Sequence, residues 1–330
     1  YGVYGQATTE IISQNPYLLC NDPTFLPFER ADNIANRMMM EYDSHQRIAG
    51  GVLYVLRHNS QKGHCCVPYD RLVETVSAFI GVEPEKVEGV IEEKCDEGEL
   101  FCEEINERPF VYLAQLYVAE LVSCQKLTQL MASKPKTNID ISSVINTVQN
   151  ILDIKYAPNQ IKALEKVADS SVCIITGGPG TGKSMILRAI LDIYRRQNPG
   201  KEICLCAPTG RAARRMEQAT GLEASTVHKA LGLLAGEDGD YGEPQALDAD
   251  IILVDEVSMM DIYLAGRLLE AVKSRAQVVL IGDSDQLPSV GPGAVLSEMI
   301  ASERIPVVRL DKVFRQNDGS RIAVNAKLIR

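Results

Sequence analysis

The sequence predicts an α/β fold: a parallel sheet with helices on both faces in the second half of the chain, preceded by a mostly helical first half. In the second half, short apolar stretches alternate with helical patterns, and the first half shows no such alternation. Strands that are apolar at every position are typical of parallel sheets buried on both faces. A glycine-rich loop between one such strand and the helix after it supports the same interpretation.

The first half is expected to consist of helices joined by short turns. Only residues 98–113 differ, because they read as a β-hairpin after a helix and so predict a small winged-helix-like unit. Residues 133–140 are polar, include a proline and lack periodicity, which indicates a linker. The helical patterns lie at about 5–14, 27–40, 46–57, 69–80, 84–97 and 111–130.

In the second half, ligands are expected at the carboxyl ends of the strands, where parallel sheets of this kind bind them. The unusual polar residues of this half follow those ends. The expected strands are Val172–Thr176, Ile203–Ala207, Ile251–Asp255, Val278–Gly282 and Val307–Leu310. The helical patterns between them lie at about 184–197, 210–219, 259–273 and 293–302.

Composition sets broad limits on the protein class. The 330 residues suffice for two or three domains, and 45% hydrophobic with 24% charged residues is ordinary globular composition. No apolar run reaches the ~18 residues that a membrane span needs, so we expect no membrane partner. Nine cysteines without a CxxC pair indicate reduced thiols in a cytoplasm. Of the net charge of −10, residues 1–150 carry −9, so charge alone neither indicates nor excludes nucleic acid.

A phosphate-binding loop is predicted in CIITGGPGTGKSMILRAIL (173–191), which places Gly-x-x-x-x-Gly-Lys-Ser between a strand and a helix. The glycines let successive N–H groups point at phosphate oxygens, and the helix start adds its positive end. Lys183 is expected to reach the β- and γ-phosphates and Ser184 to bind Mg²⁺. The alternative is a glycine-rich turn with a helix-capping serine. The expected nucleotide contacts are Gly178, Pro179, Gly180, Thr181, Gly182, Lys183 and Ser184.

The segment IILVDEVSMMD (251–261) supplies acidic partners for this loop. Asp255 would hold Mg²⁺ through water at the carboxyl edge of the sheet, and Glu256 would orient and deprotonate the attacking water. Taken alone, the Asp-Glu pair could be a helix cap. Because it follows a phosphate-binding loop by about 70 residues, we expect a protein that binds and hydrolyses ATP with Mg²⁺.

Several further motifs resemble those of superfamily-one helicases, in the same order along the chain. They look most like the B group, which moves 5′ to 3′ on single-stranded DNA, and within it like RecD-like helicases. These motifs are APTGRAARRM (207–216), STVHKALG (225–232), VDEVSMMD, GDSDQLPSVGPG (282–293) and LDKVFRQ (310–316). The first half is similar to the front end of the stand-alone RecD-like type in YGQATTEIISQNPYLL (4–19), RADNIANRM (30–38), GHCCVPYDRL (63–72) and VYLAQLYVAE (111–120).

The resemblance implies the fold and the domain organisation. The core would be a RecA-like P-loop NTPase domain, preceded by an all-helical helix-hairpin-helix region and a small winged-helix-like unit. The implied domains are a helix-hairpin-helix region at 1–47, a helical and winged-helix-like domain at 48–132, a linker at 133–156, a first RecA-like domain at 157–302 with a small hairpin insertion at about 232–249, and the start of a second RecA-like domain at 303–330.

For the nucleotide, the resemblance implies four more residues. Gln160 would read the adenine edge, Gln286 would sense the γ-phosphate, and Asp283 would brace the site or the water on Mg²⁺. Arg315 would be the arginine finger, reaching the γ-phosphate across the cleft between two RecA-like domains. Asp285 is expected to form only a turn. On the residues alone, Gln160 could be a polar residue in a helix's first turn and Arg315 a surface salt-bridge residue.

For DNA, the resemblance implies contacts from Thr209, Arg211, Thr226 and His228. The alternatives are a strand-to-helix cap at Thr209 and a structural role for His228. The implied partner is single-stranded DNA or a 5′-tailed duplex, bound by a cytoplasmic monomer in DNA repair or recombination. The resemblance names no protein partner.

The chain ends at Arg330, shortly after the arginine-finger motif, so we expect it to lack the rest of a second RecA-like domain. Translocation needs two lobes that close on ATP and open after hydrolysis. We therefore expect this polypeptide to bind ATP with Mg²⁺ weakly, hydrolyse it poorly and not unwind DNA. Two other functions remain open: the α subunit of a multi-subunit exonuclease V, and a P-loop ATPase that remodels protein complexes without moving on DNA.

Overall fold

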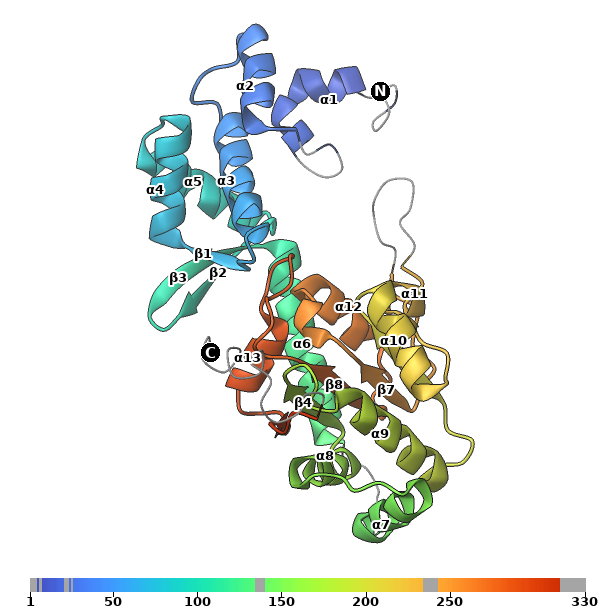
Figure 1. Cartoon of the computed structure of the whole chain (residues 1–330). Helices are drawn as coiled ribbons and strands as arrows, with labels where there is room; N and C mark the ends of the chain where they lie inside the picture. The colour runs from blue at the N-terminus through green and yellow to red at the C-terminus, as the bar shows by residue number, and fades with distance from the viewer. Residues whose placement is uncertain are drawn as a thin grey trace, which may run out of the picture. The chain divides into compact units, whose positions relative to one another are not determined.

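The computed structural model describes residues 5, 8–20, 24, 26–133, 140–233 and 243–314 (Figure 1). The chain divides into two compact units. The first includes the described residues up to Leu121, and the second includes Val122–Leu233, Glu243–Ser289 and the described residues from Ala294 onward. The long helix α6 (Ala114–Ala132) runs through the boundary between the two units.

The first unit combines helices with a three-stranded antiparallel sheet of order β1-β3-β2. The predicted hairpin is confirmed: β2 and β3 pair up to Ile105 and Arg108, and the turn residues Asn106 and Glu107 have positive φ angles of 52° and 63°. Positive φ at both central residues matches the right-handed twist of a hairpin. The elements are α1 (Thr8–Gln14), η2 (Pro16–Cys20), α2 (Phe28–Arg37), α3 (His45–Ser60), β1 (Cys66–Pro68), α4 (Tyr69–Ile80), α5 (Pro84–Asp96), β2 (Leu100–Ile105) and β3 (Arg108–Leu113).

A buried polar cluster ties the helices of the first unit together. Arg47 on α3 donates from Nε to Asp32 Oδ1 at 2.7 Å and from a terminal nitrogen to the Ile80 carbonyl at 2.8 Å. The Tyr17 hydroxyl donates to the same Asp32 oxygen at 2.6 Å. Burial raises the pKa of the Asp32 carboxyl, but hydrogen bonds from Arg47 and Tyr17 outweigh it, so the pKa lies below its usual value. The cluster thus joins η2, α2, α3 and the end of α4.

The second unit contains a six-stranded sheet of order β6-β5-β7-β8-β4-β9, in which every pair is parallel. The five predicted strands are all present, within one residue of their expected ends. A short strand that the sequence pattern did not reveal, β6, adds to one edge. The strands are β4 (Val172–Gly177), β5 (Ile203–Ala207), β6 (Ser225–Thr226), β7 (Ile251–Val254), β8 (Gln277–Gly282) and β9 (Val307–Leu310).

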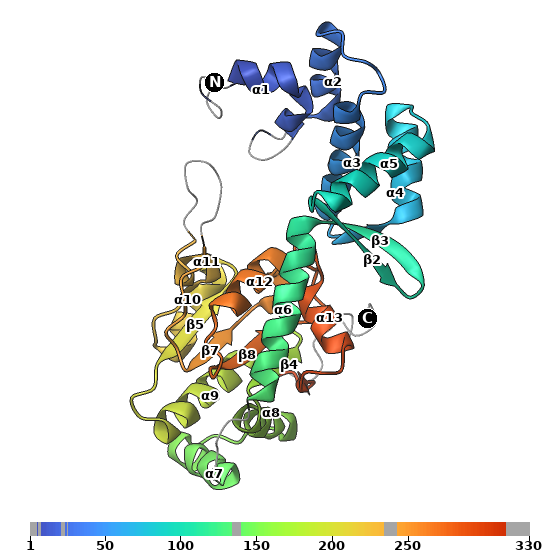
Figure 2. The same ribbon diagram turned by 180° about the vertical axis from the view of Figure 1, so that it is seen from behind.

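Helices cover both faces of this sheet, as predicted. Figure 1 shows α9 and α10 in front of the sheet, and Figure 2 shows α12 and the second half of α6 on the opposite face. On that second face Lys126 of α6 donates to the Val272 carbonyl at 2.8 Å, just beyond the end of α12. The helices are α7 (Ile141–Leu152), α8 (Pro158–Asp169), α9 (Lys183–Gln197), α10 (Gly210–Thr220), α11 (Val227–Ala230), α12 (Ile262–Ala271) and α13 (Val295–Ala301), with a 3₁₀ turn η3 (Val257–Met259).

The expected linker at 133–156 needs correction, because half of it is helix α7. Asp140 caps this helix by accepting from the backbone N–H groups of Ser142 and Ser143. Ile145 and Val148 are buried in the same core as the sheet's apolar residues. Apolar residues spaced three and four apart make α7 amphipathic, so it packs as part of the second unit. Residues 134–139 of the expected linker lie outside the described residues.

The expected domain boundary at 302/303 also needs correction. Strand β9 lies in the region predicted to begin a second domain, yet it pairs with β4 over Ile174–Gly177 in the same sheet. Its residues Val308 and Leu310 are buried in the sheet's core. A parallel strand is joined to its neighbour by long-range pairing, which no local pattern reveals. Of the hairpin insertion predicted at about 232–249, residues 234–242 lie outside the described residues.

Candidate nucleotide-binding site

The glycine-rich loop has the conformation that a phosphate cradle needs. It leaves β4 at Gly177 and enters α9 at Lys183, and Gly180 and Gly182 have φ angles of 81° and 88°. Residues with side chains rarely adopt this left-handed region, so glycine is required at these two turns. The loop delivers the N-terminus of α9 to the carboxyl edge of the sheet, where an anion is stabilised by free N–H groups.

The loop is braced by its own polar groups. Lys183 Nζ donates to the Gly177 carbonyl at 2.5 Å and to the Gly178 carbonyl at 3.4 Å. The Thr181 hydroxyl donates to the Gly178 carbonyl at 2.8 Å, and Thr181 itself is buried. A Cβ atom at Gly177 would lie 2.8 Å from the Leu310 carbonyl oxygen, so β9 leaves no room for a side chain there. Strand β9 therefore helps to shape the loop.

Gln160 lies against this loop from the side of α8. Its side chain is 2% exposed, and Oε1 accepts the backbone N–H of Ala157 at 2.9 Å. Its Nε2 atom is buried without a partner among the described residues. Gln160 sits in the first turn of α8, and its Nε2 atom lies 2.5 Å from the Cβ position of Gly182 in the loop. A buried donor without a partner suits a polar ligand.

The end of β7 places the acidic pair beside the loop. Asp255 donates its backbone N–H to the Cys206 carbonyl at 3.0 Å, and its carboxyl accepts from the Glu256 N–H at 2.9 Å. Burial raises the pKa of the Asp255 carboxyl, and the positive charge of Lys183 opposes that rise. Lys183 and Asp255 therefore lie close enough for their charges to interact at the carboxyl edge of the sheet.

Glu256 is held in a conformation that residues with side chains adopt rarely. Its φ and ψ are 55° and 40°, and its Oε2 atom is buried without a partner among the described residues. Glu256 occupies the N-cap position of η3 without a side-chain cap bond, and α12 is capped by Asp261, which accepts the Leu264 N–H at 2.8 Å. Strained backbone and an unpaired buried carboxylate oxygen are both concentrated at functional sites.

The loop after β8 joins the same edge. Asp283 is 2% exposed, and its carboxyl accepts the Asp285 N–H at 3.1 Å, so Asp283 is the residue whose side chain holds the turn. Gln286 is exposed, and its Oε1 accepts from the Ser258 hydroxyl at 3.3 Å. Since Ser258 lies two residues after Glu256, this bond connects the β8 loop to the acidic segment after β7.

Thr176 and Ser284 are a pair that the sequence reasoning missed. The Thr176 hydroxyl accepts the Ser284 N–H at 3.1 Å and donates to its hydroxyl at 3.2 Å. The bond joins the end of β4, just before the phosphate loop, to the turn after β8. The only sequence signal was a threonine that follows the apolar residues 172–175.

The residues implied for DNA gather at the edge strand β6. Thr209 caps α10 by accepting the Ala212 N–H at 3.3 Å, and Thr226 caps α11 by accepting the Lys229 N–H at 3.1 Å. The Cγ2 atom of Thr226 lies 4.0 Å from the Cβ position of Gly210, so the two caps are adjacent. The cap alternative for Thr209 is therefore confirmed.

Two implied DNA contacts follow these caps by two residues. Arg211 is exposed on α10, and His228 is half-buried on α11. The adjacent caps bring the two segments together, so Arg211 and His228 share one region of the carboxyl edge.

Arg315 lies outside the described residues, but the residue before it is at the phosphate loop. Phe314 donates its backbone N–H to the Gly180 carbonyl at 2.9 Å, and its ring lies 3.6 Å from the Cβ position of Gly182. The Lys312 amine lies over that ring, 5.4 Å from its centroid. Sequence reasoning missed Phe314, although its position next to Arg315 was a usable signal.

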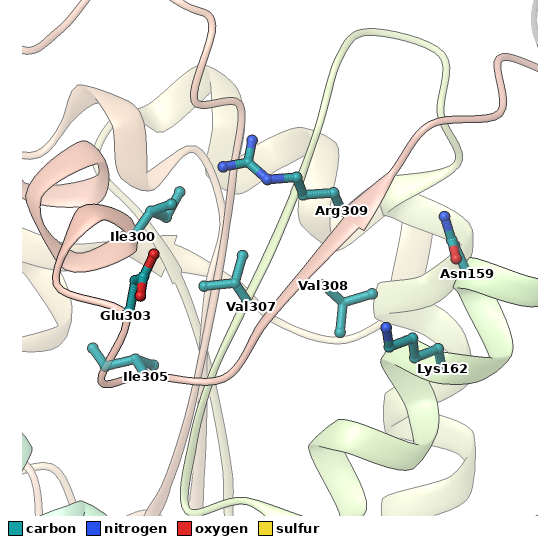
Figure 3. A pocket seen from close by; sticks show the side chains of 8 residues that line it. All are labelled: Asn159, Lys162, Ile300, Glu303, Ile305, Val307, Val308 and Arg309. Carbon is teal, nitrogen blue, oxygen red and sulfur yellow. The ribbon is translucent and has the colours of Figure 1, made fainter.

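A separate cavity of about 460 Å³ lies along the edge strand β9 (Figure 3). Figure 3 shows Asn159 and Lys162 of α8 on one side of the strand, and Ile300, Glu303 and Ile305 on the other. None of the residues predicted for the nucleotide or for DNA lines it. The candidate nucleotide-binding site therefore lies elsewhere, at the loops that follow β4, β7 and β8.

The residues present fit ATP with Mg²⁺. In the described residues no group of three or more His, Cys, Asp or Glu side chains is arranged to hold a metal. Mg²⁺ needs no such cage, since one or two protein oxygens and the substrate's phosphates suffice. Ser184 is exposed in the first turn of α9, and Asp255 directly follows β7, close enough to Lys183 for the two charges to interact. The unpaired amide of Gln160 and the unpaired oxygen of Glu256 add partners for a polar ligand.

Two family profiles match the chain. One, described as "AAA domain", covers residues 155–330, and the other, described as "ATP-dependent RecD2 DNA helicase HHH domain", covers residues 1–66. The chain belongs to the AAA-domain family, in its RecD-like branch. The match confirms the predicted family and the α/β fold with a helix-hairpin-helix region at the N-terminus. No described helix of this RecD-like chain is long and apolar enough to cross a bilayer.

Relatives named RecD2 and RecD are similar to this chain. The ATP-dependent RecD2 DNA helicase of Deinococcus radiodurans is 32% identical over 302 residues, which are 88% of this chain and 41% of the relative. The RecBCD enzyme subunit RecD of Mycolicibacterium smegmatis is 32% identical over 214 residues, which are 58% of this chain and 37% of the relative. The RecD-like chain thus spans less than half the length of either relative.

Among solved structures, a Pif1 helicase from Candida albicans is similar over 52% of this chain and 43% of that one. The sequence identity is 26% and the TM-score is 0.39, a value that supports no further argument.

Proposed function

We propose that the protein is an ATP-dependent DNA helicase of the RecD-like type, which couples ATP hydrolysis to 5′→3′ movement on single-stranded DNA. One observation carries the proposal: the ends of β4, β7 and β8 bring Lys183, the Asp255–Glu256 pair and Gln286 to one edge of the sheet. Family membership and the relatives' names support the same activity.

Nucleotide binding follows from the loop and α8. The N–H groups of residues 178–182 and the N-terminus of α9 would surround the phosphates, with Lys183 moving from the Gly177 carbonyl to the β- and γ-phosphates. The unpaired Nε2 of Gln160 would donate to the adenine edge. The exposed ring of Phe314 beside Gly182 would pack against the base.

Hydrolysis would use the acidic pair. Mg²⁺, held by Ser184 and through water by Asp255, would supply charge neutralisation between the phosphates. The buried, unpaired oxygen of Glu256 would accept a proton from the attacking water. Gln286, bonded to Ser258, would report the γ-phosphate to the segment that carries Glu256. Arg315 would complete the charge stabilisation, one residue after Phe314.

DNA would lie along the carboxyl edge at β5 and β6. The Thr209 and Thr226 hydroxyls hold helix caps, so their segments would present backbone N–H groups, while Arg211 would contact a phosphate directly. His228 would be a further contact. The protein would act on 5′-tailed duplexes in the cytoplasm as a monomer.

The RecD subunits among the relatives make the α subunit of an exonuclease V the second candidate. The match of residues 1–66 to the RecD2 helix-hairpin-helix profile favours the stand-alone form. Unwinding by the purified full-length protein, with 5′-tailed and 3′-tailed duplexes side by side, tests both points. We expect unwinding of the 5′-tailed substrate without other subunits. Unwinding only of the 3′-tailed duplex, or only with partner subunits, would contradict the proposal.

A further inference from the structure

Two cysteines of the first unit lie in contact at the base of the β2–β3 hairpin. Cys95 is in the last turn of α5, Cys102 is in β2, and their Sγ atoms are 3.1 Å apart. An S–S bond is about 2.05 Å long, so a movement of about 1 Å would join them. Both are free thiols in the structure.

The fold holds this pair together through a short, well-braced turn. The Gly98 N–H donates to the Cys95 carbonyl at 3.1 Å, and the Glu99 N–H donates to the Lys94 carbonyl at 3.0 Å. Lys94 Nζ also binds Glu97 at 2.6 Å and Glu99 at 3.2 Å. The approach of the two sulfur atoms is therefore set by backbone and side-chain bonds on both sides of the turn.

The register of β2 directs Cys102 toward α5. Side chains alternate along a strand, so Cys102 shares a face with Leu100, which is fully buried in the core that α5 also enters. Cys102 lies at the rim of that face and is exposed, whereas Cys95 is half-buried. A small oxidant in solution can therefore reach one sulfur directly while the second lies within contact distance.

We propose that Cys95 and Cys102 form a reversible intramolecular disulfide under peroxide, which covalently ties α5 to strand β2. In the first step the Cys102 thiol is oxidised by hydrogen peroxide, giving a sulfenic acid and one water. In the second, the Cys95 sulfur attacks the sulfenic sulfur, and the hydroxyl leaves with the Cys95 proton as a second water. Two electrons pass from the thiols to the peroxide.

The surroundings assign the order of the two steps. Burial, the neighbouring Cys102 sulfur and the carboxylates of Asp96 and Glu92 raise the pKa of the Cys95 thiol to about 12. Cys95 is thus protonated at neutral pH and reacts poorly with peroxide by itself. Its contact with Cys102 replaces a bimolecular encounter, which favours it as the second partner.

The test uses a cleavage pattern that the sequence provides. A protease that cuts after glutamate separates the two cysteines at Glu97 and Glu99, so fragments 94–97 and 100–103 stay joined only through a disulfide. We expect the joined fragment, lighter by two hydrogen atoms, in most molecules after peroxide treatment of the folded protein. Dithiothreitol should separate it. The unfolded protein, treated in the same way, should give mixed pairs among its nine cysteines.

Two serine variants and a matched control complete the experiment. Cys95→Ser and Cys102→Ser should each abolish the joined fragment, and Cys124→Ser, which removes an exposed cysteine of α6, should leave it unchanged. Should either serine variant fail to fold, the wild-type fragment and its reversal still decide the question. Irreversible oxidation of Cys102 without a joined fragment would overturn the proposal, as would disulfides between two copies of the chain.

Discussion

The side-chain amide of Gln160 occupies the space where a side chain at Gly182 would begin. Its Nε2 atom lies 2.5 Å from the Cβ position of Gly182, and Gly182 has a φ angle of 88°. One contact therefore joins the residue proposed to read adenine to the turn that forms the phosphate cradle. A substitution at either residue should therefore displace the other and so affect nucleotide binding.

The substitution Gly182→Ala should weaken nucleotide binding by at least about 10-fold, equivalent to about 1.4 kcal/mol. It adds backbone strain and displaces the buried Gln160 amide. The control is Gly200→Ala, where φ is 81° but the Cβ position is open. Both variants should lose about 1 kcal/mol of stability, but only Gly182→Ala should lose affinity for a non-hydrolysable ATP analogue, measured by calorimetry. Equal affinities for the two variants would contradict the contact's role.

The substitution Glu256→Gln should lower kcat for ATP by about 10²- to 10⁴-fold, because a positioned general base contributes that much. Affinity for nucleotide should stay unchanged, since the amide keeps the shape of the carboxyl. Single-turnover hydrolysis by the full-length protein measures the first quantity, and analogue binding measures the second. The matched control Glu270→Gln, on the exposed side of α12, should match the wild type. A Glu256→Gln variant with normal kcat would assign the base elsewhere.

Substitutions at the two ends of the Thr209–Arg211 segment should separate helix capping from DNA contact. Thr209→Ala removes the cap on Ala212 and should cost about 1 kcal/mol of unfolding free energy. Arg211→Ala should leave stability unchanged, weaken single-stranded DNA binding and reduce the slope of log K against log salt by about 0.7. Arg196→Ala, in the last turn of α9, is the control. Unchanged DNA affinity in Arg211→Ala would show that Arg211 does not contact DNA.

The cluster of Asp32, Arg47 and Tyr17 should make the first unit sensitive to acid. The folded-state pKa of Asp32 lies below its ordinary value, so its contribution to stability is present above the unfolded pKa of about 3.9 and is lost as pH falls through the folded pKa. Asp32→Asn should cost about 3 kcal/mol at pH 7, because Arg47 would lose its buried partner.

Denaturant unfolding at neutral and acidic pH measures this effect. The difference between the wild type and Asp32→Asn should shrink as pH drops below about 4. The control Asp70→Asn breaks the exposed Arg108 pair and should leave stability close to that of the wild type at every pH. If Asp32→Asn lowers the free energy of unfolding by the same amount at every pH, the charge of Asp32 is not what stabilises the cluster.

The sheet and the glycine-rich loop could be predicted from the sequence because both depend on local signals. Continuous apolar residues marked five of the six strands, and the left-handed turns at Gly180 and Gly182 require glycine. Two predictions were wrong: the domain boundary at 302/303 and the linker at 133–156. The true assignments depend on contacts between distant residues. Strand β9 belongs to the sheet through its pairing with β4, and α7 belongs to the second unit through its burial. The pairing of β9 with β4 is not visible in a short stretch of chain, whereas the amphipathic pattern of α7 is visible and was overlooked.

The roles of single side chains were harder to predict than their positions. Asp283 and Asp285 are two residues apart, and only the structure shows that the Asp283 carboxyl accepts the Asp285 N–H. The same holds for Thr209, whose hydroxyl bonds the Ala212 N–H. In both cases the residue type allowed several hydrogen bonds, and the backbone conformation decided among them.

The rate of ATP hydrolysis by the full-length protein, with and without a single-stranded oligonucleotide, tests whether this site drives movement on DNA. We expect DNA to stimulate the rate strongly in the wild type, and Lys183→Ala to abolish hydrolysis in both conditions because the phosphates lose their cation. Stimulation should weaken as salt rises, since DNA binding releases counterions. A wild-type rate that is the same with and without DNA would contradict the proposal that this site drives movement on DNA.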